Sequence, residues 1–199
     1  MSVQTNVFLE LSSKCVCACP KCPRTILKGL YKEKDIPLKF VEQSLQLKPK
    51  RVYLLGNLGD PIFHSQFPEV IKMCNDYNQP FNVHTVGSAY DKDWWRNVYN
   101  LYDDDRSRWV FTLDGLKYNA GTYRKGLIFD KTFDAMKIGA ELGKNIEWQY
   151  IVFKHNQNDI DEVKKICNDL GVKLRIVFNE KWDENDPHEP TISENDIDK

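Results

Sequence analysis

The chain of 199 residues has no apolar run that approaches 18 residues, so nothing in it predicts a membrane-spanning helix. Its first residues, MSVQTNVFLELSSK, lack the basic start and the long apolar stretch of a secretory signal peptide. These two absences predict a cytoplasmic protein, and in that compartment cysteine thiols stay reduced.

A strong net charge is also missing, because 28 lysines and arginines nearly balance 29 aspartates and glutamates. The formal charge of -1 argues against non-specific binding of nucleic acid or of an anionic membrane. Hydrophobic residues make up 41% of the chain, which is ordinary for a globular protein. No internal repeat or low-complexity linker divides the sequence, and its length suits a single domain with a substantial core.

Short apolar runs alternate with helical patterns along most of the chain. The sequence predicts strands at 6–12, 51–56, 81–87, 108–115, 146–153 and 172–178. It predicts helices at 37–47, 68–77, 93–102, 130–143 and 160–171. In the helix at 93–102, the spacing places Trp94, Val98 and Leu101 on one face. This alternation indicates an α/β fold with a parallel sheet, either a partial barrel or a doubly wound layer.

The composition changes at residue 179, where the segment NEKWDENDPHEPTISENDIDK is acidic and nearly without apolar periodicity. We therefore expect one domain over 1–178, followed by an acidic C-terminal extension over 179–199 that is partly disordered. In parallel α/β folds the functional residues gather in the loops at the carboxyl ends of the strands, and the candidate residues were sought there.

Four of the six cysteines lie within KCVCACPKC, residues 14–22, directly after the first predicted strand. In a reducing compartment such a cluster indicates a metal or redox role rather than disulfides. A structural zinc site usually takes its ligands as two separated pairs, and a Cys19–Cys22 thiol oxidoreductase would leave Cys15 and Cys17 unexplained. Cys15, Cys19 and Cys22 together have the spacing C-x3-C-x2-C. Three thiolates can hold three irons of a 4Fe-4S cluster and leave the fourth iron open.

The stretch LELSSKCVCACPKCPR resembles the radical S-adenosylmethionine (radical SAM) enzymes, whose signature is CxxxCxxC after the first barrel strand. Within that family, its sequence is most similar to those of the peptide- and protein-modifying maturases. The resemblance extends over about residues 5–178 and implies a single-domain partial (β/α)6 TIM-like barrel. Two positions depart from the family: Val16 follows the first cysteine where Asn is frequent, and Lys21 stands where an aromatic residue is common.

The resemblance also implies an activity. In the family, the open iron chelates S-adenosyl-L-methionine, and an electron from the cluster cleaves this cofactor to methionine and a 5′-deoxyadenosyl radical. The radical then abstracts hydrogen from a substrate, here a peptide, a protein or a small molecule. An electron donor such as flavodoxin or ferredoxin is implied as a partner. Two alternatives stay open, namely a non-catalytic zinc or iron–sulfur scaffold module and a CxxC thiol oxidoreductase.

The ends of the later strands match further family segments, among them Leu58-Gly59-Asp60-Pro61, where Asp60 takes the place of a glutamate that pairs with the methionine ammonium. The resemblance implies Cys15, Cys19 and Cys22 as metal ligands, and as cofactor-binding residues Gly59, Asp60, Pro61, Thr85, Gly87, Ser88, Thr112, Asp114, Arg124, Val152 and Lys154. Cys17 lies outside the pattern and is interpreted as a small packed residue. Cys74 and Cys167 fall on apolar helical faces and are interpreted as core residues. No catalytic side chain is indicated.

Overall fold

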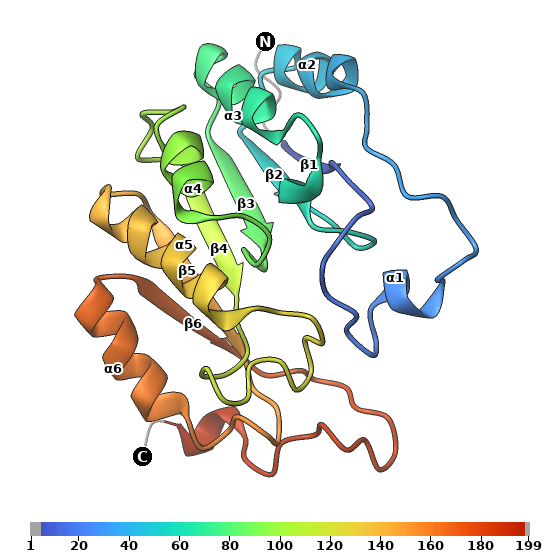
Figure 1. The fold of residues 1–199 in the computed structure, drawn as a ribbon, viewed down its shortest axis with the longest axis vertical. Coiled ribbons are helices and arrows are strands. Elements are labelled where there is room, and N and C mark those ends of the chain that lie inside the picture. The colour runs from blue at the N-terminus through green and yellow to red at the C-terminus, as the bar shows by residue number, and fades with distance from the viewer. Residues whose placement is uncertain (1–4, 198–199) are drawn as a thin grey trace.

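The computed structural model describes residues 5–197, and its centre is a parallel sheet of six strands (Figure 1). The strands are β1 (Asn6–Glu10), β2 (Arg51–Leu55), β3 (Phe81–Thr85), β4 (Arg108–Thr112), β5 (Ile146–Ile151) and β6 (Lys173–Val177). The α-helices are α1 (Pro23–Ile26), α2 (Leu38–Gln46), α3 (Phe67–Asp76), α4 (Lys92–Tyr99), α5 (Phe129–Glu141) and α6 (Ile160–Leu170). Two short 3-10 helices are η1 (Pro61–Phe63) and η2 (Glu194–Asp196).

The order of the strands in the sheet is their order in the chain, and every neighbouring pair is parallel. Helices α2 to α6 follow one another along a single outer face of the sheet (Figure 1). A doubly wound layer would reverse the strand order and place helices on both faces. The partial (β/α)6 barrel expected from the resemblance is therefore the observed fold, and β1 and β6 are its two open edges.

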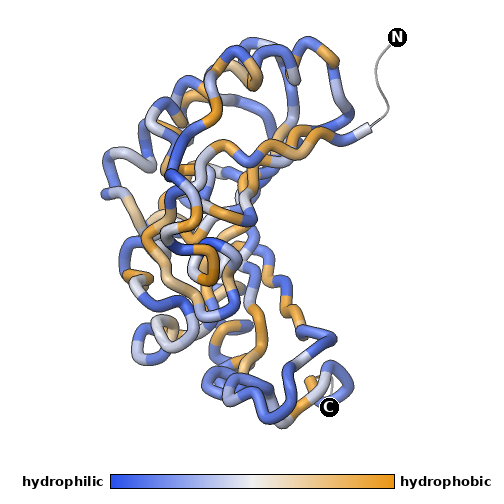
Figure 2. Tube along the Cα trace, turned by 90° about the vertical axis from the view of Figure 1, so that its right-hand side faces the viewer, coloured by the Kyte–Doolittle hydropathy of each residue, from blue (hydrophilic) through white to orange (hydrophobic). Residues whose placement is uncertain are grey.

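Alternation of residues along the strands builds the core between sheet and helices. Trp109 and Phe111 of β4 and Trp148 of β5 are buried on the outer face, beneath the helices. The Trp109 indole Nε1 donates a hydrogen bond of 2.9 Å to the buried Tyr102 hydroxyl, so its polar atom is satisfied within the core. Figure 2 shows the apolar strand segments running through the middle of an open crescent.

The predicted face of the helix at 93–102 is wrong by one position. Helix α4 ends at Tyr99 and buries Trp95, Val98 and Tyr99, whereas Leu101 lies beyond its end. Trp94 is only partly buried because its ring stacks on Tyr90, with 3.9 Å between ring centroids, at the edge of the core. Either tryptophan of the Trp94-Trp95 pair could occupy the buried position of the helical pattern, and packing against the sheet decides which of them is buried.

Both cysteines assigned to the core, Cys74 of α3 and Cys167 of α6, are buried there. Helix α6 ends at the predicted glycine, since Gly171 has φ 67° and takes the left-handed conformation of a C-terminal cap. No helix in the described part of the chain has the length and apolar character needed to cross a membrane.

The described part of the acidic segment, residues 179–197, lies against the carboxyl ends of the strands and the cysteine loop. The Lys21 ammonium forms ion pairs with Asp183, at 2.7 Å, and with Asp186. The Lys154 backbone N–H donates to the His188 carbonyl at 3.0 Å, and Ile197 packs against the core. These contacts attach residues 179–197 to Lys21 of the cysteine loop and to the loop after β5, while the partial disorder of the extension stays a prediction.

Candidate metal and cofactor site

The four clustered cysteines line one cavity of about 260 Å³ at the carboxyl ends of β1 to β4. The cavity is lined by Cys15, Cys17, Cys19, Cys22, Arg24, Leu55, Gly56, Asn57, Gly59, Asp60, His84, Thr85, Val86, Thr112 and Arg124. It therefore collects side chains from segments far apart in the sequence, at the end of the sheet where the site was expected. All four cysteines in it are free thiols.

Backbone contacts on two sides fix the course of the cysteine loop. On the β2 side, the Asp60 N–H donates to the Lys14 carbonyl at 2.8 Å. On the other side, the Ala18 N–H donates to the Lys125 carbonyl at 2.8 Å. At its end the loop turns into helix α1, for which Cys22 is the N-cap residue and Pro23 follows in the first turn. The loop is thus held by the loops after β2 and β4.

Glycine is required at two positions of the loop after β2, for a reason that the sequence did not reveal. A Cβ atom on Gly59 would lie 2.0 Å from the Ser12 carbonyl oxygen and 2.7 Å from the Ser13 backbone. A Cβ atom on Gly56 would lie 2.6 Å from the Gly59 carbonyl oxygen. Gly59 therefore permits close approach between this loop and the segment that leads into the cysteine loop, and Gly56 permits a tight turn within its own loop.

Asp60 is a buried carboxylate that ties this loop to the end of β3. One of its oxygens accepts from the Thr85 hydroxyl at 2.9 Å and from the Val86 N–H at 2.8 Å. The other accepts from the Ile62 N–H at 3.3 Å, as the cap of η1. Burial raises the pKa of Asp60 to about 6. Because a carboxylate has about four lone-pair sites, Asp60 keeps acceptor capacity toward the cavity.

Cys17 is buried beside two of the proposed ligands and affects both thiols. Its backbone N–H donates to the Cys15 sulfur at 3.3 Å. Hydrogen bonding from the Cys17 thiol lowers the pKa of Cys15, and the same interaction lowers the pKa of Cys19 to about 7. The positive charge of Arg124 also favours the Cys19 thiolate. Cys17 is packed, as interpreted, and in addition it lines the cavity and supports two neighbouring thiolates.

Asp114 and Arg124 form a buried ion pair with 2.6 Å between Nε and Oδ2. Arg124 lines the cavity, whereas Asp114, whose side chain is fully buried, lies behind it and also accepts from the Ile151 N–H at 3.0 Å. Burial raises the pKa of Asp114, and the Arg124 charge acts against that rise. Asp114 therefore positions Arg124 instead of facing the cavity as Thr112 does.

Of the predicted cofactor-binding residues, Gly59, Asp60, Thr85, Thr112 and Arg124 line the cavity. The remaining predicted residues lie outside that lining: Pro61, Gly87, Ser88, Asp114, Val152 and Lys154. Ser88 accepts from the Ile128 N–H at 2.6 Å, and Val152 is buried in the main core.

Sequence reasoning missed Arg24, Asn57, His84 and Val86 as lining residues. Arg24 ends the CPR stretch next to the motif, and His84 precedes the predicted Thr85 on the same strand. The position of Arg24 next to the motif and that of His84 near a strand end could therefore have indicated both residues.

The residues present fit a cluster held at three corners. The Arg24 Nε is buried without a hydrogen-bond partner among the described residues, although the same guanidinium donates to the Cys17 carbonyl at 3.1 Å and to Glu33 at 2.8 Å. A cavity with four free thiols and a guanidinium Nε that has no hydrogen-bond partner among the described residues suits a sulfur-rich anionic group. Across residues 5–197, no set of three or more His, Cys, Asp or Glu side chains is placed to hold a single metal ion. In a cubane cluster each iron takes only one protein thiolate, so three thiols in one cavity are sufficient to hold three of its corners.

No protein-family model matches this chain, and no curated protein matches it. Solved structures do match its fold. SuiB of Streptococcus suis bound to S-adenosylmethionine superposes with a TM-score of 0.75 at 15% identity, over 99% of this chain and 46% of SuiB. The enzyme anSMEcpe with bound AdoMet gives 0.71 at 15% identity, over 94% of this chain and 54% of that one. Methylornithine synthase (PylB) gives 0.68 at 14% identity, over 96% of this chain and 59% of that one.

These matches show that the chain has the fold of these solved structures, a partial barrel of six parallel strands with helices on its outer face. The chain spans less than half the length of SuiB and a little over half that of anSMEcpe.

Proposed function

We propose that this chain is a radical SAM enzyme, which binds a 4Fe-4S cluster and S-adenosyl-L-methionine and removes a hydrogen atom from a peptide or protein substrate. The observation that carries the proposal is the meeting of Cys15, Cys19 and Cys22 in one cavity, at the carboxyl ends of the strands, with Asp60 and Arg124. When bound, the cluster and the cofactor together supply a 5′-deoxyadenosyl radical.

The chain's own residues hold and orient these groups. Cys15, Cys19 and Cys22 are the proposed cluster ligands. The positive charge of Arg24 lies near the Cys15 sulfur and that of Arg124 near the Cys19 sulfur, and a nearby positive charge favours the thiolate form that ligation needs. The three proposed ligands lie close together because they come from one loop, which backbone hydrogen bonds hold on two sides.

Asp60 and Arg124 are the proposed contacts to the amino acid part of the cofactor. Asp60 retains acceptor capacity for an ammonium group, while Arg124 lies beside the thiols and has only Asp114 as an ion-pair partner among the described residues. Thr112 and Thr85 add hydroxyl groups at the same cavity. A carboxylate and a guanidinium in one small cavity match the two charged groups of an amino acid.

A peptide substrate is supported by two of the structural neighbours, since SuiB was solved bound to the precursor peptide SuiA and anSMEcpe with the Cp18Cys peptide. The open edges at β1 and β6 leave room for an extended chain along the inner face. An electron donor of the flavodoxin or ferredoxin type belongs to the same proposal.

The test is anaerobic reconstitution of the full chain with iron and sulfide, followed by dithionite and S-adenosyl-L-methionine. We expect a brown protein with about four irons per chain, and 5′-deoxyadenosine detected by mass spectrometry. A colourless protein with one zinc, or a well-formed cluster that binds the cofactor yet gives no 5′-deoxyadenosine with candidate peptides present, would reject the proposal.

The variant Cys15→Ala separates this function from a thiol oxidoreductase. We expect it to lose 5′-deoxyadenosine formation, because one corner of the cluster is then without its ligand. A dithiol activity of Cys19 and Cys22 would survive the change, since Cys15 is not part of that CxxC pair. Dithiol turnover that persists in Cys15→Ala, with no cofactor cleavage in the wild type, would favour the oxidoreductase instead.

A further inference from the structure

The inner face of the sheet, opposite the helices, carries a group of cationic side chains that the proposed cofactor site does not use. We define the basic face as Arg51 of β2, Arg108 of β4, and Lys173 and Arg175 of β6. Each alternates along its strand with residues packed in the core, such as Val52 or Trp109, so all four lie on the inner side.

The basic face is not neutralised within the described chain. Arg108 and Arg175 share a single buried carboxylate, Glu147, at 2.7 and 2.6 Å. Lys173 donates to the Asn145 side chain at 3.1 Å instead of to an acid. Among the ion pairs of the described residues, the four cationic groups of the basic face thus have a single carboxylate partner, Glu147.

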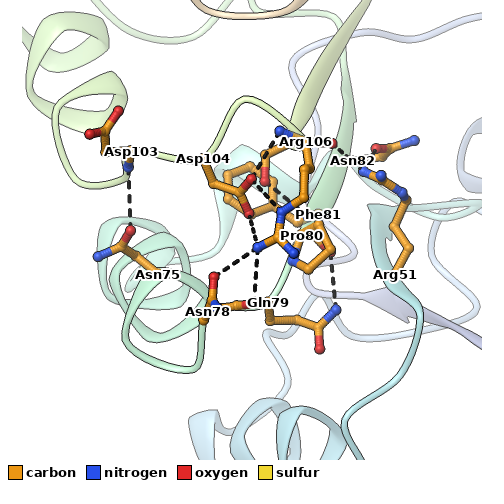
Figure 3. Close-up of polar contacts among 11 residues, drawn as sticks. Arg51, Asn75, Asn78, Gln79, Pro80, Phe81, Asn82, Asp103, Asp104 and Arg106 are labelled. Carbon is orange, nitrogen blue, oxygen red and sulfur yellow. Dashed lines mark hydrogen bonds and ion pairs between the residues drawn. The ribbon is translucent and has the colours of Figure 1, made fainter. Parts of the chain in front are cut away.

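Arg51, like Lys173, forms no ion pair with a carboxylate among the described residues, although its charge contributes to the lowered pKa of Asp104. Its guanidinium donates to the Asn82 side chain at 2.9 Å and to the Arg106 carbonyl at 2.6 Å (Figure 3). Arg106 itself is occupied by Asp104, at 2.8 Å, and by Asn78 (Figure 3). Neutral acceptors hold Arg51 in place without cancelling its charge.

A pocket of about 280 Å³ lies at this position and has an almost wholly polar lining. Its walls are Arg51, Tyr53, Asn82, Arg106, Arg108 and Asn145. Guanidinium and amide groups are the donors with which proteins hold carboxylates and other oxyanions.

The pocket adjoins the cysteine cavity along the strands. His84 lies two residues beyond Asn82 on β3, on the same inner face, and lines the cysteine cavity. Thr112 of β4 also lines the cysteine cavity. It lies four residues beyond Arg108, and four residues correspond to about 13 Å along a strand. Burial lowers the pKa of His84, and the charges of Arg175 and Arg108 lower it further, so the positive potential extends to the cavity.

An apolar wall accompanies the charges on the same face. The Phe8 ring stacks on Tyr53 with 4.8 Å between centroids, and the Phe8 side chain is 63% exposed although it lies on a strand. The stacked rings place apolar surface beside the charged groups on the same face.

We propose that the basic face binds acidic side chains of the peptide substrate, with Arg51 and Arg108 holding a carboxylate about 13 Å from the cysteine cavity. This inference rests on the proposed function and assigns its substrate a chemical class. A pocket with a few arginines matches one or two glutamates or aspartates, whereas nucleic acid binding typically neutralises about 6–10 phosphates. In an extended peptide, 13 Å is about four residues, so acidic residues are expected at roughly that separation from the reacting residue.

The test measures binding of short fluorescein-labelled peptides to the reconstituted full chain by anisotropy. One peptide carries a pair of glutamates among apolar residues, and its match carries glutamines instead. We expect the glutamate peptide to bind about tenfold more tightly or better, and its advantage to shrink as salt is added. Equal binding of the two peptides would overturn the proposal, as would tighter binding of a single-stranded oligonucleotide.

Variants identify the residues. We expect Arg51→Gln to remove most of the preference for the glutamate peptide, and Arg175→Gln, at an exposed position, to weaken it as a second variant. Arg96→Gln is the matched control, because Arg96 lies on α4, outside the basic face, and pairs with Asp93. An equal loss in all three variants, or no loss in the first two with circular dichroism unchanged, contradicts the assignment.

The binding measurement is independent of cofactor cleavage. If the wild type binds the glutamate peptide with the stated preference yet forms no 5′-deoxyadenosine, the proposed radical function fails and the basic face keeps its assignment. If 5′-deoxyadenosine forms and the preference is absent, the basic face loses its assignment and the radical function stands.

Discussion

Gly59→Ala tests whether backbone contact between two loops builds the cysteine site. The added Cβ would lie 2.0 Å from the Ser12 carbonyl oxygen, whereas ordinary contact begins at 3.4 Å, so the two loops must separate by about 1.4 Å, the difference of those distances. The obstructing atoms are backbone, which cannot turn aside as a side chain can. Such overpacking costs typically 1–3 kcal/mol, and we expect about 3 kcal/mol here.

Urea unfolding of the cluster-free chain measures this cost. With a urea dependence of about 1–3 kcal/mol per molar, a loss of about 3 kcal/mol should lower the midpoint by about 1–3 M. Iron incorporation should fall as well, because Ser12 and Ser13 lead directly into the cysteine loop. The matched control is Gly121→Ala, where an added Cβ meets no atom within 4 Å. Equal midpoints and equal iron contents for Gly59→Ala and Gly121→Ala would refute the reasoning.

Three further outcomes are expected. Arg124→Gln leaves the fully buried Asp114 without its cation and should destabilise the chain by about 3–5 kcal/mol in urea unfolding. The double variant with Asp114→Asn should recover part of this loss. A loss under about 1 kcal/mol would contradict the pairing. The raised pKa of Asp60, about 6 against 3.8, means that folding favours its protonated form, so stability is lost as pH rises through that window. Between about pH 5 and about pH 7.5 the cluster-free wild type should lose about 1 kcal/mol more than Asp60→Asn, and parallel pH profiles in urea would argue against it. Cys17→Ala should retain iron in a colorimetric assay while Cys15→Ala does not, and the reverse order would assign Cys17 as the ligand.

The parallel sheet and its order of elements were predictable because each strand and helix has its own local pattern of apolar residues. Local patterns do not report where chains pass close to one another. The pairing of Asp114 with Arg124 depends on the fold of the loop after β4, and the family resemblance that predicted Asp114 as a cofactor contact did not report this pairing. The shift from Trp94 to Trp95 on α4 has the same origin, since only packing against the sheet distinguishes two adjacent tryptophans.

The candidate ligands were predictable for a different reason, because three of them lie within eight residues and share one loop. The basic face was not, since its arginines come from three strands and are charged positions in otherwise ordinary strand patterns.

The two chemical regions of the inner face follow from a single feature of parallel sheets. All strands point the same way, so their carboxyl ends bring the cysteine loop together with Asp60, and their amino-terminal halves bring Arg51 beside Arg108. A ligand that spans both regions must lie roughly along the strands, with its anionic part toward the strand starts. The geometry therefore limits substrate orientation as well as charge, and a substrate whose acidic group adjoins its reacting carbon could not occupy both regions at once.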